Sequence, residues 1–142
     1  MCVASDSLHT LAEFAKQFPN SVPADTKARS TLQSFLDRGS VVQARHATIV
    51  LASIPDNEKM CKSIVQTISD RLEVTSERLL TDLTILAKMV QYCPQAFNAC
   101  SSQIVSFIIK KLITTNIPSQ EVRIFPIYRH LKDPDDHEEK CN

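Results

Sequence analysis

The chain contains a single glycine, Gly39, among its 142 residues, and this scarcity limits the folds that it can adopt. Phosphate-binding loops and dinucleotide-binding fingerprints need several glycines close together, so both kinds of site are excluded. Tight β-hairpins usually place glycine at turn positions with positive φ. The sequence therefore favours helices over β-architecture.

Apolar residues recur at intervals of three and four between the prolines, a spacing that predicts six helices. Asp6 or Ser7 is expected to cap the first helix, and Asp25 the second, which ends at Gly39. Ser40 is expected to cap the third helix. The six helices are predicted within residues 6–18, 25–39, 40–54, 56–72, 76–93 and 99–114.

The prediction of how the helices pack rests mainly on the apolar faces of three of them. The third helix has a wide apolar face that includes Ala47 and Val50, and Arg45 is expected to project roughly opposite to it. The sixth is apolar nearly all round, so it should be buried on more than one side. The predicted inward stripe of the fifth helix consists of Leu79, Leu83, Leu86, Val90 and Cys93.

The six helices form three antiparallel pairs that begin near residues 5, 40 and 76, a repeat of about 35 residues. Residues 32–38 are also similar to residues 65–71. The sequence thus predicts an all-α fold, an α-solenoid of about three HEAT/armadillo-like helix pairs over residues 1–115. Residues 116–142, rich in proline and acidic, are expected to be an irregular and mobile tail.

Charge and hydropathy narrow the function further. The chain has 16 basic and 16 acidic side chains, which argues against sequence-specific nucleic-acid binding or binding through bulk positive charge. It has no apolar run of about 18 residues that could span a membrane. No signal peptide is visible, and the five scattered cysteines make a poor disulfide framework. A reducing compartment is the expectation.

The sequence offers no catalytic residue, metal site or cofactor. Cys93 and Cys100 are seven residues apart, whereas zinc knuckles need cysteines about two to four apart and a second pair. Cys61 and Cys93 lie on apolar stripes, where a thiol stays protonated and inert.

Three basic residues are candidates for partner binding: Arg45, Lys110 and Lys111. Arg45 either lies on a solvated face or contacts an acidic partner segment. The two lysines either offset the dipole at the end of the sixth helix or join a basic patch. Arg38, Arg71 or Lys88 would complete that patch, which could hold a phosphate or an acidic peptide.

Several segments resemble the cohesin-regulatory HEAT-repeat proteins of the "precocious dissociation of sisters" family. The order and spacing of the segments, over residues 8–113, make the resemblance. They are STLQSFL (30–36) with Gly39 and QARHA (43–47), LLTDL (79–83) with ILA (85–87), CPQAF (93–97), and VSFIIKKLI (105–113).

This resemblance implies a non-enzymatic protein of the nucleus and its chromatin, acting in sister-chromatid cohesion. Family members bind the cohesin complex through its kleisin subunit and work with a release factor and an acetyltransferase. The segments correspond to a small middle part of a longer family chain, so a fragment is expected, with possible self-association through open solenoid ends. The alternatives are a generic HEAT/armadillo adaptor in trafficking or nuclear import, and an enzyme of unknown type.

Overall fold

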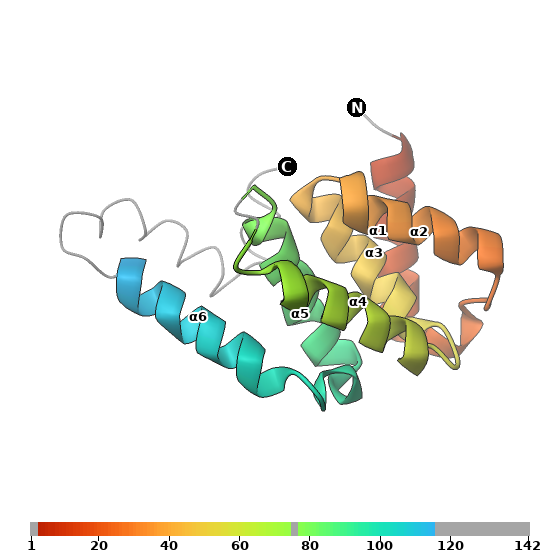
Figure 1. Cartoon of the computed structure of the whole chain (residues 1–142). Helices are drawn as coiled ribbons and strands as arrows, with labels where there is room; N and C mark the ends of the chain where they lie inside the picture. Colours follow the sequence, from red (N-terminus) through yellow and green to blue (C-terminus); the bar gives the residue numbers. More distant parts are fainter. Residues whose placement is uncertain (1–2, 75–76, 116–142) are drawn as a thin grey trace. The chain divides into compact units, whose positions relative to one another are not determined.

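The computed structural model describes residues 3–74 and 77–115, which form six α-helices and two short 3-10 helices (Figure 1). No strand occurs in these ranges. The structure confirms an all-α fold that is consistent with an α-solenoid of helix pairs. The elements are α1 (Val3–Gln17), η1 (Pro19–Ser21), α2 (Thr26–Arg38), α3 (Val41–Ser53), α4 (Glu58–Arg71), α5 (Leu79–Tyr92), η2 (Pro94–Phe97) and α6 (Ser101–Thr115).

The chain forms two compact units, Met1–Ser101 and Ser102–Asn142. Helices α1 to α5 belong to the first unit, and all but the first residue of α6 belongs to the second. The predicted boundary between residues 115 and 116 remains a prediction, because residues 116–142 lie outside the described ranges.

Helix α3 is the centre of the first unit. It packs most extensively against α5, α1 and α2 (Figure 1). Ala44 to Leu51 are eight consecutive buried residues, so α3 has no solvated face along these two turns. The apolar face predicted for α3 is therefore buried, and the side chains opposite to it are buried as well.

The predicted caps of α2 and α3 are confirmed. The Asp25 side chain accepts a hydrogen bond from the backbone N–H of Ala28, and Ser40 and Gln43 form a reciprocal capping box. Gly39 ends α2 with φ −80°, so the junction uses no left-handed conformation. A Cβ there would lie 2.6 Å from the Phe35 carbonyl oxygen, so close backbone approach is what requires glycine.

One predicted helix start is wrong, that of α1, whereas the predicted start of α4 is confirmed in position. Helix α1 begins at Val3, so Asp6 and Ser7 lie inside the helix and neither caps it. Asn57 stands at the N-cap position of α4, but its side-chain amide donates to the Leu51 carbonyl oxygen at 2.9 Å. The link from α3 to α4 is thus held by a bond back to α3. Ser76, predicted to precede α5, lies outside the described residues.

The predicted inward stripe of α5 is rotated from the observed one. Leu79 and Leu83 are only half-buried, and Val90 is 52% exposed. The residues that the helix buries are Thr81, Asp82, Thr84, Ile85, Leu86 and Met89. The carboxylate of Asp82 thus occupies an interior position, where it pairs with Arg71 of α4.

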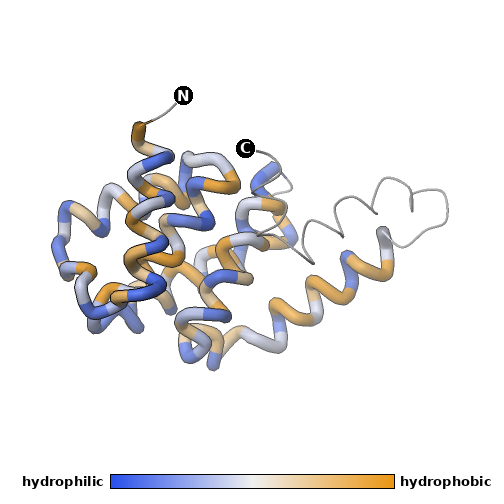
Figure 2. Tube along the Cα trace, turned by 180° about the vertical axis from the view of Figure 1, so that it is seen from behind, coloured by the Kyte–Doolittle hydropathy of each residue, from blue (hydrophilic) through white to orange (hydrophobic). Residues whose placement is uncertain are grey.

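Helix α6 is also less buried than its composition predicted. Ile104 and Phe107 are its buried residues. Four aliphatic side chains along the same helix are exposed, and apolar residues follow one another along its trace in Figure 2: Val105, Ile109, Leu112 and Ile113. The prediction of burial on more than one side is therefore wrong.

Candidate functional site

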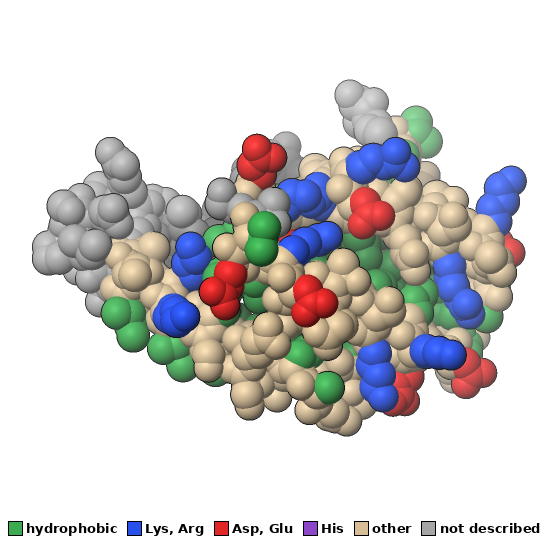
Figure 3. Space-filling model, viewed as in Figure 1, with side chains coloured by type: hydrophobic (Ala, Val, Ile, Leu, Met, Phe, Trp, Pro, Cys, Tyr) green, Lys and Arg blue, Asp and Glu red, His purple; other side chains and the backbone are tan. Residues whose placement is uncertain are grey.

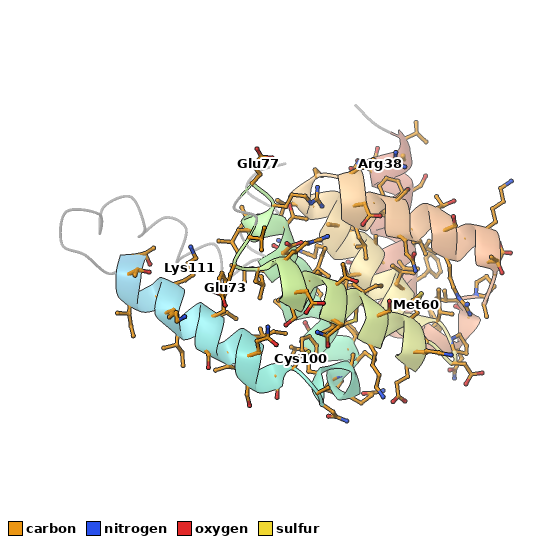
Figure 4. The ribbon with its side chains drawn as sticks, viewed as in Figure 1. Arg38, Met60, Glu73, Glu77, Cys100 and Lys111 are labelled. Atoms are coloured by element: carbon orange, nitrogen blue, oxygen red, sulfur yellow. The ribbon has the colours of Figure 1, made fainter. Side chains whose placement is uncertain are left out.

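A groove of about 320 Å³ lies between α2 and α4 in the first unit. Its deepest lining residues are Ile68 and Ile85, which are almost fully buried. Met60 projects from α4 beside it (Figure 4). The polar side chains that complete the lining are Gln33, Asp37, Ser63, Thr67 and Arg71, and Leu36 and Ile64 add apolar surface.

Arg71, at the end of α4, forms a two-point ion pair with Asp82 of α5. Its Nη2 lies 2.7 Å from Asp82 Oδ1, and its Nε donates to Oδ2 at 3.1 Å. The Asp82 side chain is 1% exposed and that of Arg71 is 31% exposed. The pair explains why a carboxylate is tolerated on the inward face of α5, because a buried charge needs a partner with matched hydrogen bonds.

The environment of Arg71 stabilises its charged form. Hydrogen bonding to Asp82 raises the pKa of the Arg71 guanidinium, partial burial opposes this, and the charges of Asp82 and Asp37 add to the rise. Arg71 therefore presents a fixed positive charge to the groove while its strongest bonds hold α4 to α5.

A second arginine joins α2 to the start of α5. Arg78 Nη2 donates to the Leu36 carbonyl oxygen, one of the last carbonyls of α2. Helix ends leave such carbonyls without an intrahelical donor, and an arginine close to the end satisfies one. This bond and the Arg71–Asp82 pair connect the two walls of the groove to the same helix, α5.

The lining suits an extended polypeptide. Apolar surface at Leu36, Ile64 and Ile68 can receive a side chain, and the amide and hydroxyl groups of Gln33, Ser63 and Thr67 can bond its backbone. Acid–base or nucleophilic chemistry would need a nucleophile within hydrogen-bond reach of a base. The groove lining contains neither histidine nor cysteine.

The three described cysteines are buried: Cys61, Cys93 and Cys100. Burial raises the pKa of the Cys61 thiol, and neighbouring Cys93 raises it further. Burial followed by the charge of Asp70 raises the pKa of Cys100. Because the thiolate is the reactive form, Cys61 and Cys100 are poor nucleophiles. Cys2 and Cys141 lie outside the described residues.

Arg45 does not lie where the sequence placed it. The residue is 3% exposed within α3, so the expectation that it projects into solvent is wrong. The cause is that α3 is covered by three helices, whereas a surface helix has one solvated side. At this position the side chain is withdrawn from any partner on the surface.

Lys110 and Lys111 lie on the exposed part of α6, where Lys111 is labelled in Figure 4. Lys111 Nζ lies 5.6 Å from the centroid of the Phe107 ring, a cation–π contact. Their role in binding stays a prediction. The patch that Arg38, Arg71 or Lys88 would complete also stays a prediction.

Residues 1–140 match the family described as sister chromatid cohesion protein PDS5. The chain belongs to the PDS5 family. No curated protein and no solved structure matches it significantly. PDS5 membership confirms the resemblance drawn from the four groups of segments. It gives the chain a role in sister-chromatid cohesion, a process of chromosomes during cell division.

Over residues 3–74 and 77–115, no three histidine, cysteine or acidic side chains converge as ligands for a metal ion. Within the same ranges, none of the helices has both the length and the apolar character needed to cross a membrane.

Sequence reasoning missed Asp82 and its partner Arg71 in this PDS5-family chain. The signal was present, because Asp82 lies one helical turn before Ile85 and Leu86, both fully or nearly fully buried. An acid at such a position requires a base nearby. Arg71 is eleven residues earlier, on the preceding helix, so the pair could have been sought there.

Proposed function

We propose that this chain is a non-catalytic scaffold that binds cohesin subunits on nuclear chromatin. The observation that carries the proposal is the PDS5 family match over nearly the whole chain. Family membership favours cohesion over the alternative of an adaptor in trafficking or nuclear import. The buried, high-pKa thiols Cys61 and Cys100 support a binding role over a catalytic one.

The groove between α2 and α4 is the proposed docking place for an extended segment of the kleisin subunit. Its apolar floor at Ile68 and Ile85 gives burial for one or two kleisin side chains. Asp37 and Arg71 offer charges of both signs at its lining, which can fix the direction and register of a peptide. A release factor would act on the scaffold together with kleisin.

The test is a titration of purified kleisin with the whole chain and two matched variants. Thr67→Arg places a long charged side chain from an exposed lining position into the groove. Gln66→Arg adds the same side chain one residue earlier, at an exposed position outside the lining. We expect Thr67→Arg to weaken binding about tenfold or more and Gln66→Arg to change it by less than about twofold.

Two outcomes would count against the proposal. If the folded wild-type chain shows no binding to kleisin, the cohesin partner is wrong for this chain. If both variants weaken binding equally, the groove is the wrong place. Capture of binding partners from nuclear extract tests the alternative of an adaptor in trafficking or nuclear import. Recovery of transport components without cohesin subunits would favour that adaptor.

A further inference from the structure

The two walls of the α2–α4 groove have separate supports. Helix α2 packs mainly against α3, whereas α4 packs mainly against η2 and α5. Helices α2 and α4 make few direct contacts with each other, although both line the groove. The distance between the walls is therefore not set by packing of one wall on the other, and a third element has to set it.

The first turn of α5 bonds to both walls. Arg78, at the N-cap position of α5, donates from Nη2 to the Leu36 carbonyl oxygen of α2. Asp82, one turn later, accepts two hydrogen bonds from Arg71 of α4. The backbone N–H of Asp82 donates to the Arg78 carbonyl oxygen at 2.8 Å. The two side chains that bond to the walls thus stand on one helical turn.

Both bonds act at the same end of the groove. Helices α2 and α4 run in the same direction in Figure 1, and Leu36 and Arg71 lie in the last turn of their helices. Met60, labelled in Figure 4, lies in the first turn of α4. The walls are therefore joined through α5 at the end of the groove away from Met60.

We infer that Arg78 is a positioning residue of the groove, whose bond to Leu36 sets the distance between α2 and α4. The inference rests on the proposed binding of a kleisin segment there. Arg78 is not among the lining residues, so it acts through the placement of α2. Figure 3 shows basic and acidic side chains interspersed over α2 and α4, which leaves the spacing of the walls as the means of holding a segment from both sides.

The hydrogen bonding of Arg78 fits a role in geometry better than a role in overall stability. Its Nε is buried and has no hydrogen-bond partner among the described residues. A buried guanidinium with an unmet donor stabilises a fold poorly, and an apolar side chain of similar length can replace it at little cost. We therefore expect Arg78→Met to lower the urea midpoint less than Arg71→Met does.

The first test measures the distance between the walls by pulsed electron paramagnetic resonance. Nitroxide labels are attached at Arg38→Cys on α2 and Gln66→Cys on α4, both exposed positions outside the lining. The remaining accessible thiols are removed with Cys2→Ser and Cys141→Ser. We expect Arg78→Met to broaden the distribution of label distances toward longer values. Arg78→Lys, which keeps a donor, should restore most of the wild-type distribution.

The second test titrates purified kleisin with the whole chain and the same variants. We expect Arg78→Met to weaken binding about tenfold and Arg78→Lys to recover most of the affinity. Arg29→Met is the matched control, since Arg29 is half-buried on α2, lies outside the lining and also has a buried Nε without a partner. It should change affinity by less than about twofold and leave the label distances unchanged.

The two tests separate this inference from the proposed function. An unchanged distance distribution in Arg78→Met would overturn the inference, even if kleisin binds the wild-type chain. A wider groove with unchanged kleisin affinity would overturn the link between wall spacing and binding. Absence of kleisin binding by the folded wild-type chain would overturn the proposed function, and the label distances would still decide whether Arg78 sets the spacing. A fall in urea midpoint as large as that of Arg71→Met would assign Arg78 to overall stability instead.

Discussion

Asp82 and Arg71 are paired, but the two side chains differ in their access to water, and this difference predicts unequal mutant effects. Removing the Arg71 guanidinium would leave the carboxylate of Asp82 buried and unpaired. Removing the carboxylate would leave Arg71, whose side chain is 31% exposed and can turn toward solvent. We expect Arg71→Met to lower the free energy of unfolding by about 3–5 kcal/mol. Asp82→Asn should cost less.

Urea unfolding of both variants and of the double variant measures this difference. Replacing both partners with uncharged residues can be nearly neutral, because no charge is then left alone in the interior. The double variant should therefore be more stable than Arg71→Met. Equal losses for the two single variants would contradict the asymmetry, and an additive double variant would contradict the pairing.

Cys61 predicts a dependence of stability on alkaline pH. Burial holds the pKa of its thiol well above the ordinary value of about 8.5. Above that ordinary value the unfolded chain releases the thiol proton while the folded chain keeps it. The free energy of unfolding should therefore be unaffected below about pH 8.5 and fall above it, by about 1.4 kcal/mol per pH unit for one thiol.

Urea melts between pH 7 and pH 10 measure the slope in the wild type and in Cys61→Ala. The variant is expected to lose stability at every pH through its cavity, but its decline above pH 8.5 should be shallower. Cys100, whose pKa is also raised by burial, supplies part of the remaining slope. Identical slopes in both proteins would contradict the role of Cys61.

The surroundings of some single residues could be predicted from the sequence, and those of others could not. The inert interior position of Cys61 could be predicted, since an apolar stripe surrounds it at helical spacing. The burial of Arg45 could not be predicted, because the apolar pattern within one helix does not show how many other helices cover that helix. Asp82 was missed for the same reason: its partner lies on another helix.

At the scale of the helix, α5 provides a direct test of the observed face. Met89 is fully buried, whereas the adjacent Val90 is 52% exposed and had been predicted to point inward. We expect Met89→Ala to cost about 2–5 kcal/mol of unfolding free energy. Val90→Ala should cost less than about 0.5 kcal/mol. Chemical denaturation distinguishes the two, and a larger loss for Val90→Ala would restore the predicted stripe.

Helix ends were more predictable than helix faces. Asp25 and Ser40 were identified as caps from local sequence, because the side chain bonds a backbone N–H only three residues on. The faces of α5 and α6 depend on distant residues. Where a helix has two overlapping apolar stripes, the regular spacing of its leucine and isoleucine residues does not show which stripe faces the interior.

At the scale of the whole molecule, the unit Met1–Ser101 is expected to fold by itself. Apart from Ile104 and Phe107, all of the buried hydrophobic residues in the described ranges lie within it. We expect a chain ending at residue 101 to remain helical and to unfold in one cooperative transition. Circular dichroism and urea unfolding test this. A non-cooperative transition would show that the core needs residues beyond 101.

The order of six helices and their short links could be predicted, because proline positions and apolar spacing are local signals. The groove could not. It is formed by α2, α4 and one residue of α5, and their approach depends on the Arg71 and Arg78 bonds to Asp82 and to Leu36. Such bonds join residues that single-helix patterns do not relate.

The enclosure of α3 has a consequence for backbone dynamics. Its amide hydrogens are bonded within the helix, and the helix is packed by α1, α2 and α5. Deuterium can reach them only when the surrounding helices separate, so their exchange should report opening of the whole unit. The outer turns of α1, where Phe14 is exposed, should exchange through smaller and more frequent openings. The slowest-exchanging amides of α3 thus measure the stability of Met1–Ser101 without any denaturant.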